Sequence, residues 1–133
     1  MAARILLVDD DQTIREAYSF VLAAKGYVVD VADGGRAALK LATANEPDLI
    51  LLDLIMPGVS GVEFLRRYDL SKHPKVKVIL FSNSQAVQDA KEALRLGAFE
   101  IILKSHFTPD QTVESIERAF KGQKAIDPEN TPS

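Results

Sequence analysis

Short runs of hydrophobic residues recur along the chain, and polar segments separate them. The runs are Ile5–Val8, Tyr27–Val29, Leu49–Leu52, Val76–Phe81 and Ile101–Leu103. Three of them are continuous rather than alternating, which is typical of central strands that are buried on both faces of a sheet. The second run alternates, with Asp30 before Val31, and this pattern predicts an edge strand.

The segments between these runs carry apolar residues at helical spacing. The apolar positions are Ile14, Tyr18, Val21 and Leu22, then Ala37, Ala38, Leu41 and Ala42, then Val62, Leu65 and Tyr68, then Val87, Ala90, Ala93 and Leu94, and last Val113, Ile116 and Phe120. Gly26 and Gly97 are predicted to end the first and fourth helices as left-handed caps. The fifth helix has the clearest start, with Thr108 as N-cap, Pro109 at the first position and Gln111 at the third.

Strand and helix therefore alternate five times with short connections. This order predicts an α/β fold of the (βα)5 type, a doubly wound five-stranded parallel sheet with right-handed crossovers and helices on both faces. The 133 residues suffice for one domain with a real core. We expect the domain over residues 1–122, and a flexible C-terminal tail over the polar, proline-containing residues 123–133.

Composition narrows the possible functions. The formal net charge of -3 gives no reason to expect nucleic acid or an anionic membrane as a direct partner. The chain has no cysteine, which excludes disulfides and thiolate metal sites. No apolar run approaches membrane-spanning length, and the N-terminus has no signal-peptide layout. A cytoplasmic protein is the expectation.

Polar residues with chemical potential follow the predicted strands. They are Asp9, Asp10 and Asp11 after the first strand, Asp53 after the third, Ser82, Asn83 and Ser84 after the fourth, and Lys104 after the fifth. Ligands of parallel α/β sheets bind outside the carboxyl ends of the strands. We therefore expect carboxylates, hydroxyls and one ammonium to converge on one rim of the sheet.

Each of these residues also has a structural interpretation. One of the three aspartates after the first strand should cap the following helix, and Asp11 is the best candidate. Ser82 begins the capping-box pattern Ser-Asn-Ser-Gln before the fourth helix, although Ser84 is an equally good cap and would leave Ser82 free. Asp53 fits a turn, and Lys104 fits an ordinary surface position.

Taken together, the motifs resemble the receiver domains of two-component response regulators. They are Ile-Leu-Leu-Val-Asp-Asp-Asp at 5–11, Leu-Leu-Asp-Leu-Ile-Met-Pro-Gly-Val-Ser-Gly at 51–61, Ser82 and Lys104, and the similarity covers roughly residues 3 to 121. The resemblance implies the strand order 2-1-3-4-5, which makes the first and third strands neighbours. It also implies a cytoplasmic signalling phosphoprotein that catalyses its own phosphorylation and slow dephosphorylation, rather than a turnover enzyme.

The same resemblance implies a metal site. Asp9 and Asp10 would lie beside Asp53, and carboxylates so close repel one another unless a cation binds or their pKa values rise. Oxygen ligands without cysteine or a histidine pair favour Mg²⁺. In the family the metal is held by acidic residues that match Asp9 or Asp10, by Asp53, and by the main-chain carbonyl that matches Ile55.

The implied reaction is phosphoryl transfer from a phosphohistidine donor, on a sensor histidine kinase or a phosphotransfer protein, to Asp53. Lys104 would balance charge on the transferring oxygens and Ser82 would donate a hydrogen bond to one of them. The signal would pass to a downstream protein through the face formed by the fourth helix, fifth strand and fifth helix. No direct contact with nucleic acid or a membrane is expected.

The chain departs from the family pattern at three positions. Ser105 follows Lys104, where receivers usually have a proline in a cis peptide. Ile101 stands where the family usually has an aromatic residue whose rotation accompanies signalling, and Phe99 is expected to share its strand face two residues away. Asn83 is larger than the usual residue and would narrow access to Asp53. These departures predict altered coupling to the output face.

Three other functions compete with this interpretation. The alternative closest to it is a receiver-like binding module that works without phosphorylation, and the complete set of site residues argues against that. An aspartate-nucleophile phosphatase needs a second acid two residues after the nucleophile, where this chain has Ile55. A flavin- or dinucleotide-binding protein needs a phosphate loop after the first strand, which is absent.

Overall fold

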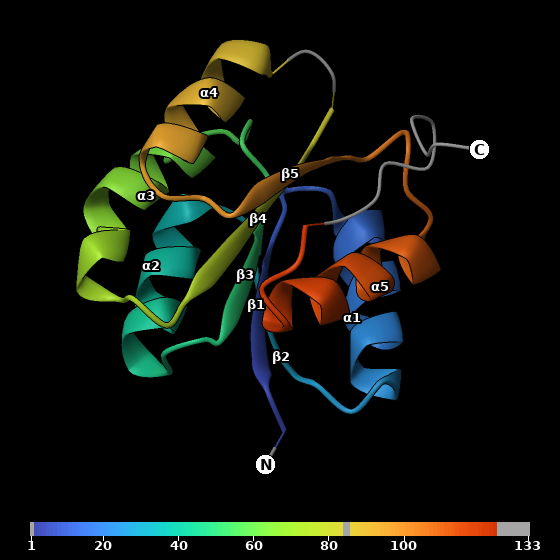
Figure 1. Cartoon of the computed structure of the whole chain (residues 1–133). Coiled ribbons are helices and arrows are strands. Elements are labelled where there is room, and N and C mark those ends of the chain that lie inside the picture. Colours follow the sequence, from blue (N-terminus) through green and yellow to red (C-terminus); the bar gives the residue numbers. More distant parts are fainter. Residues whose placement is uncertain (1, 84–85, 125–133) are drawn as a thin grey trace.

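A computed structural model describes residues 2–83 and 86–124 of the chain. The strands are β1 (Arg4–Val8), β2 (Val28–Ala32), β3 (Leu49–Leu52), β4 (Lys77–Ser82) and β5 (Glu100–Leu103). The helices are α1 (Gln12–Ala24), α2 (Gly35–Ala44), α3 (Gly61–Tyr68), the short 3-10 helix η1 (Leu70–Lys72), α4 (Val87–Arg95) and α5 (Pro109–Phe120). All strand pairs are parallel, and the order is β2-β1-β3-β4-β5 (Figure 1). The predicted fold and strand order are confirmed.

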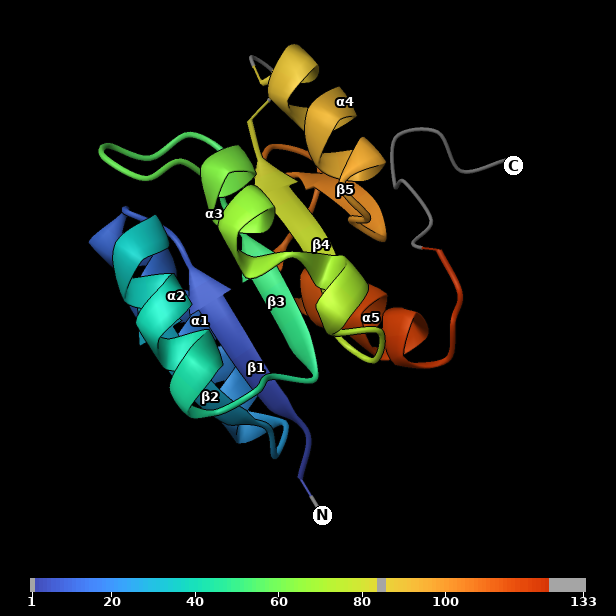
Figure 2. The ribbon, with the colours of Figure 1, turned by 90° about the vertical axis from the view of Figure 1, so that its left-hand side faces the viewer.

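The sheet separates two hydrophobic cores. In β1, Ile5 and Leu7 belong to the core under α1 and α5, whereas Leu6 and Val8 belong to the core under α2, α3 and α4. Figure 2 shows the second group of helices together on one face. Because both faces are covered, a strand with no polar residue is the stable choice, which explains the continuous run at Ile5–Val8.

β2 is an edge strand, as its alternating pattern predicted. It pairs with β1 alone, and the side chains of Val28 and Val31 stay exposed. β5 forms the opposite edge. No helix among the described residues is long and apolar enough to cross a membrane.

The helix ends follow the predicted capping residues with one exception. Asp11 caps α1 through Thr13 N–H and Ile14 N–H, and Thr108 forms a complete capping box at α5. The exception is the fourth helix, for which the sequence left Ser82 and Ser84 open as caps. Ser82 ends β4, and α4 begins after Ala86, which has no capping side chain. The alternative cap, Ser84, lies outside the described residues.

The expectation that Phe99 shares a strand face with Ile101 is also wrong. Phe99 packs against the core under α1 and α5, whereas Ile101 packs against the core on the other side of the sheet. Phe99 precedes the first residue of β5, so the strict alternation of a strand does not extend to it. The described chain contains no cis peptide bond, and Lys104–Ser105 is therefore trans.

Candidate functional site

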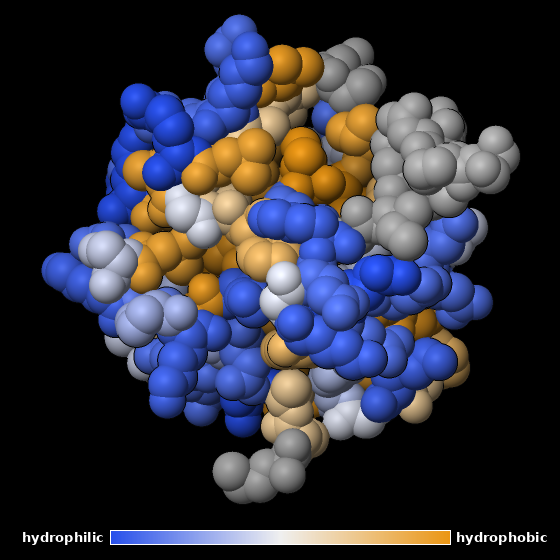
Figure 3. Space-filling model, viewed as in Figure 1, coloured by the Kyte–Doolittle hydropathy of each residue, from blue (hydrophilic) through white to orange (hydrophobic). Residues whose placement is uncertain are grey.

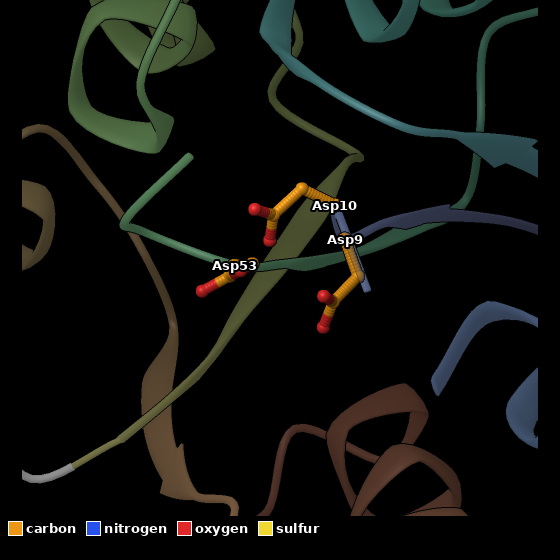
Figure 4. Close-up of side chains that lie close together, drawn as sticks. All are labelled: Asp9, Asp10 and Asp53. Carbon is orange, nitrogen blue, oxygen red and sulfur yellow. The ribbon is translucent and has the colours of Figure 1, made fainter. Parts of the chain in front are cut away.

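Three carboxylates meet at the carboxyl ends of β1 and β3 and form an acidic cluster of Asp9, Asp10 and Asp53. Asp9 and Asp10 follow β1, Asp53 follows β3, and one oxygen of each lies within 4.8 Å of the other two. Figure 4 shows the Asp10 and Asp53 carboxylates reaching into the same space, with Asp9 beside them. The predicted neighbourhood of the first and third strands therefore brings these side chains together. Asp11 points elsewhere and caps α1.

Asp9 is completely buried, and its carboxylate is held by one hydrogen bond and one ion pair. Its N–H donates to Ala32 O at 3.1 Å, and its carbonyl accepts from Arg15 Nη1 at 2.8 Å. Asp9 Oδ1 accepts from Asp11 N–H at 2.9 Å, and Oδ2 lies 2.8 Å from Lys104 Nζ. These contacts hold the Asp9 side chain in one position at the buried side of the site. Asp10, in contrast, is exposed to solvent.

Asp53 is 5% exposed and is held by its own backbone. Its N–H donates to Val8 O at 2.9 Å, and its Oδ1 accepts from Ile55 N–H at 3.4 Å. Burial raises the pKa of Asp53 to about 7 against the opposing pull of Lys104, and the Asp9 charge and a hydrogen bond with Asp10 act in the same direction as burial. A carboxylate with these surroundings favours a proton or a metal cation as a partner.

Lys104 and Ser82 complete the rim on the other side of Asp53. Lys104 Nζ lies 2.8 Å from Asp9 Oδ2 and 3.6 Å from Asp53 Oδ2. Burial alone would lower the pKa of Lys104, but its ion pairs with the two carboxylates raise it above its ordinary value. The Ser82 hydroxyl is buried and has no hydrogen-bond partner among the described residues. Such a group suits a ligand oxygen that arrives from outside.

The donor set fits Mg²⁺. Three carboxylates offer hard oxygen ligands, and the described site has neither a thiolate nor an imidazole in the acidic cluster. Lys104 supplies one positive charge against the three carboxylates, so a divalent cation would relieve the remaining repulsion. Asp10 and Asp53 would bind the metal, and Asp9 would support them from the buried side of the site. The Ile55 carbonyl stays a prediction.

Gly61 packs directly against the backbone of Asp53 and Leu54. A Cβ at Gly61 would lie 2.5 Å from Asp53 O and 2.8 Å from Leu54 Cα. We expect Gly61→Ala to lower the free energy of unfolding by about 2 kcal/mol, because backbone atoms must move apart. Gly34→Ala is the control: its Cβ meets nothing within 4 Å, and it should cost less than about 1 kcal/mol as a weaker helix cap. Equal stability of the two variants in urea denaturation would contradict this account.

Lys104 also stabilises the fold before any ligand binds. Lys104→Met leaves the buried Asp9 carboxylate without its cation, and we expect the free energy of unfolding in metal-free buffer to fall by about 2 kcal/mol. Added Mg²⁺ should recover part of the loss. Lys40→Met, on an exposed position of α2, should change stability by less than about 0.5 kcal/mol. A Lys104→Met variant as stable as this control would contradict the assigned role.

Sequence reasoning missed Arg15. Its guanidinium holds the Asp9 carbonyl, and its own N–H donates to Asp11 O within the first turn of α1. The only signal was a basic residue one turn after the predicted N-cap, and a solvent-exposed position explains such a residue equally well. Arg15 therefore positions the loop between β1 and α1 without belonging to the acidic cluster.

Comparisons with known proteins agree with this geometry. The model of the response regulator receiver domain matches residues 5–117. Regulatory protein AtoC of Escherichia coli (strain K12) is 36% identical over 120 residues, which cover 90% of this chain and 26% of AtoC. Nitrate/nitrite response regulator protein NarL of the same strain is 33% identical over 132 residues, which cover 98% of this chain and 60% of NarL. The chain thus spans between a quarter and three fifths of the length of these relatives.

Solved structures give the same result. The CheY-like response regulator receiver domain protein of Methanospirillum hungatei JF-1 superposes with a TM-score of 0.85 at 27% identity, over 92% of this chain and 97% of that one. Chemotaxis protein CheY4 of Vibrio cholerae gives 0.80 at 28% identity, over 89% and 98%. The family model covers most of the chain, and Asp9, Asp10 and Asp53 lie together at the end of the sheet. This chain therefore belongs to the receiver domains of two-component response regulators.

Proposed function

We propose that the chain accepts a phosphoryl group on Asp53 from a phosphohistidine donor and signals through protein–protein contacts. The observation that carries this proposal is the position of Asp53, which lies between two further carboxylates and the Lys104 ammonium at the open end of a parallel sheet. Family membership supports the phosphoacceptor role. The donor would be a sensor histidine kinase or a phosphotransfer protein.

Mg²⁺ would be held by Asp10, Asp53 and the main-chain carbonyl of Ile55, with Asp9 in support, and when bound it supplies positive charge for the transferring oxygens. The exposed Asp10 and the buried Asp53 differ in what they contribute. Asp10 offers a carboxylate that solvent reaches, and Asp53 offers a carboxylate whose position the backbone fixes.

In the proposed transfer, an Asp53 carboxylate oxygen forms the new O–P bond while the N–P bond to the donor imidazole breaks. A carboxylate is a weak nucleophile, but phosphohistidine is high in energy, so positioning and charge neutralisation suffice. Lys104 would turn from Asp9 toward one phosphoryl oxygen. The Ser82 hydroxyl has no partner among the described residues, and it would donate a hydrogen bond to a second phosphoryl oxygen. Slow self-dephosphorylation follows from the reactivity of an acyl phosphate.

The downstream target would bind the face formed by α4, β5 and α5. Figure 3 shows hydrophobic surface beside α4, and Val87 and Leu94 of that helix are 56% and 41% exposed. Exposed apolar side chains that lie together favour a protein partner. We propose that residues 1–122 form the receiver domain and that the chain acts in the cytoplasm. The predicted C-terminal tail over residues 123–133 lies outside the described residues from 125 onward.

Incubation with acetyl phosphate and Mg²⁺, followed by intact mass measurement, tests the proposal. The expected result is a gain of one phosphoryl group that does not occur when a chelator removes the metal. If phosphoramidate and a phosphorylated histidine phosphotransfer protein also fail to modify the chain, the proposal is overturned. The chain would then act as a receiver-like binding module, which the unusual Asn83, Ile101 and Ser105 favour.

A further inference from the structure

Ile101 stands where receivers usually have an aromatic signalling residue, and a connection from the acidic cluster to the helices would therefore run through other side chains. Lys104 is the first residue of such a connection, because its Nζ lies 5.4 Å from the centroid of the Phe81 ring. Phe81 is 1% exposed and belongs to the core under α1 and α5. The cation that pairs with Asp9 and Asp53 therefore rests on the core opposite to the one that Ile101 contacts.

The next contact is between Phe81 and Tyr18 of α1. Their ring centroids are 5.0 Å apart with an interplanar angle of 62°, an edge-to-face arrangement. Tyr18 is 4% exposed. Burial raises the pKa of Tyr18, Lys104 lowers it and Asp9 raises it. The charges of Lys104 and Asp9 therefore act on the pKa of the buried Tyr18 phenol.

The Tyr18 hydroxyl continues into α5. Tyr18 Oη lies 3.3 Å from Thr112 Oγ1, and Thr112 Oγ1 donates to Thr108 O at 3.0 Å. Because the one hydroxyl proton of Thr112 is used on Thr108, Tyr18 must be the donor to Thr112. The direction of the chain is therefore Tyr18 O–H to Thr112 O–H to Thr108 carbonyl, and Thr108 is the N-cap of α5.

These hydroxyls are buried far from one another in sequence. Thr112 is 0% exposed, and 94 residues separate it from Tyr18. A buried polar pair that is fully hydrogen-bonded is stronger than the same pair in water, and it is costly to break. Figure 1 shows α1 and α5 on the same side of the sheet. The pair joins these two helices, and Phe81 lies between Tyr18 and Lys104.

We propose that Tyr18 is a positioning residue that links Lys104 to α5 through its hydrogen bond to Thr112, and that this link replaces the missing aromatic switch at position 101. The inference rests on the proposed phosphorylation of Asp53. When Lys104 leaves Asp9 for a phosphoryl oxygen, a cation moves across the Phe81 ring and the field at the Tyr18 hydroxyl changes. The hydroxyl chain then changes the hydrogen bond at the N-cap of α5.

The test uses amide chemical shifts of the whole chain with and without beryllofluoride and Mg²⁺, an acyl-phosphate mimic. In the wild type we expect shifts at the rim, residues 9–11 and 53–55, and in α5, residues 108–115. Tyr18→Phe removes one hydroxyl and keeps the ring. It should retain the rim shifts and reduce the α5 shifts at least twofold.

Matched variants separate coupling from a structural effect. Thr112→Val should reproduce the result of Tyr18→Phe, and Thr112→Ser, which keeps a hydroxyl, should restore the α5 shifts. Ser115→Ala is the control within α5, because the buried Ser115 hydroxyl donates only to Gln111 O of its own helix. Tyr68→Phe is the control for losing a buried phenol hydroxyl, since that hydroxyl has no partner among the described residues. Both controls should respond to beryllofluoride as the wild type does.

Three outcomes would overturn the inference. Rim shifts of normal size, with α5 shifts unchanged in Tyr18→Phe and in Thr112→Val, would overturn the inference and leave the proposed function intact. The same holds if Ser115→Ala loses the α5 shifts to the same extent. Absence of rim shifts in the wild type would overturn the proposed function and this inference with it.

Discussion

Asp53→Asn is expected to abolish phosphorylation by acetyl phosphate and Mg²⁺. The amide matches the carboxylate in shape and keeps an oxygen that accepts from Ile55 N–H, so the fold should be retained. The substitution removes the carboxylate oxygen that is the proposed nucleophile and one of the three clustered charges. Intact mass under the conditions that modify the wild type should therefore show only the unmodified chain.

Asp11→Asn is the matched control for this variant. Asp11 lies two residues from Asp9 but caps α1 instead of joining the acidic cluster, and asparagine caps a helix equally well. We expect Asp11→Asn to gain one phosphoryl group at nearly the wild-type rate. A phosphoryl group on Asp53→Asn would mean that another side chain is the acceptor.

The second large effect concerns stability and pH in the absence of metal. The pKa of Asp53 is raised from an ordinary 3.8 to about 7, so the folded chain holds this proton more tightly than the unfolded chain does. The stability that this proton supplies is present in full below pH 4, and it is lost as the pH rises to about 7. At about 1.4 kcal/mol for each unit, the loss is on the order of 4 kcal/mol.

Asp53→Asn isolates this contribution, because asparagine resembles the protonated acid at every pH. The difference in free energy of unfolding between Asp53→Asn and the wild type should grow in favour of the variant between pH 4 and pH 7. Urea denaturation at several pH values, in buffer with a chelator, measures it. Saturating Mg²⁺ should reduce the difference, since the metal favours the ionised carboxylate. A difference that does not change with pH would contradict the raised pKa.

The sequence predicted most of the architecture because its signals were local. Continuous hydrophobic runs marked β1, β3 and β4, and the capping box at Thr108 marked the start of α5. The strand order was not available from periodicity, because nothing in a hydrophobic run says which strand lies beside it. It came from the resemblance to receivers, and with it came the neighbourhood of Asp9 and Asp53.

The sequence was a poor guide where the structure does not follow from capping residues or strand alternation. Ala86 has no side chain that can cap a helix, so the start of α4 carried no signal and Ser82 stayed open as a candidate cap beside Ser84. Phe99 lies one residue outside β5, where alternation no longer applies. The contact of Tyr18 with Thr112 depends on how α1 and α5 pack, and no pattern within either helix predicts it.

The partition of the interior into two cores has a consequence for protein engineering. Side chains on opposite sides of the sheet belong to separate clusters, as do Leu65 of α3 and Ile116 of α5. Free-energy changes at sites without common contacts are close to additive. Substitutions in the layer under α2, α3 and α4 should therefore change stability almost independently of substitutions in the layer under α1 and α5, so each layer can be repacked for stability on its own.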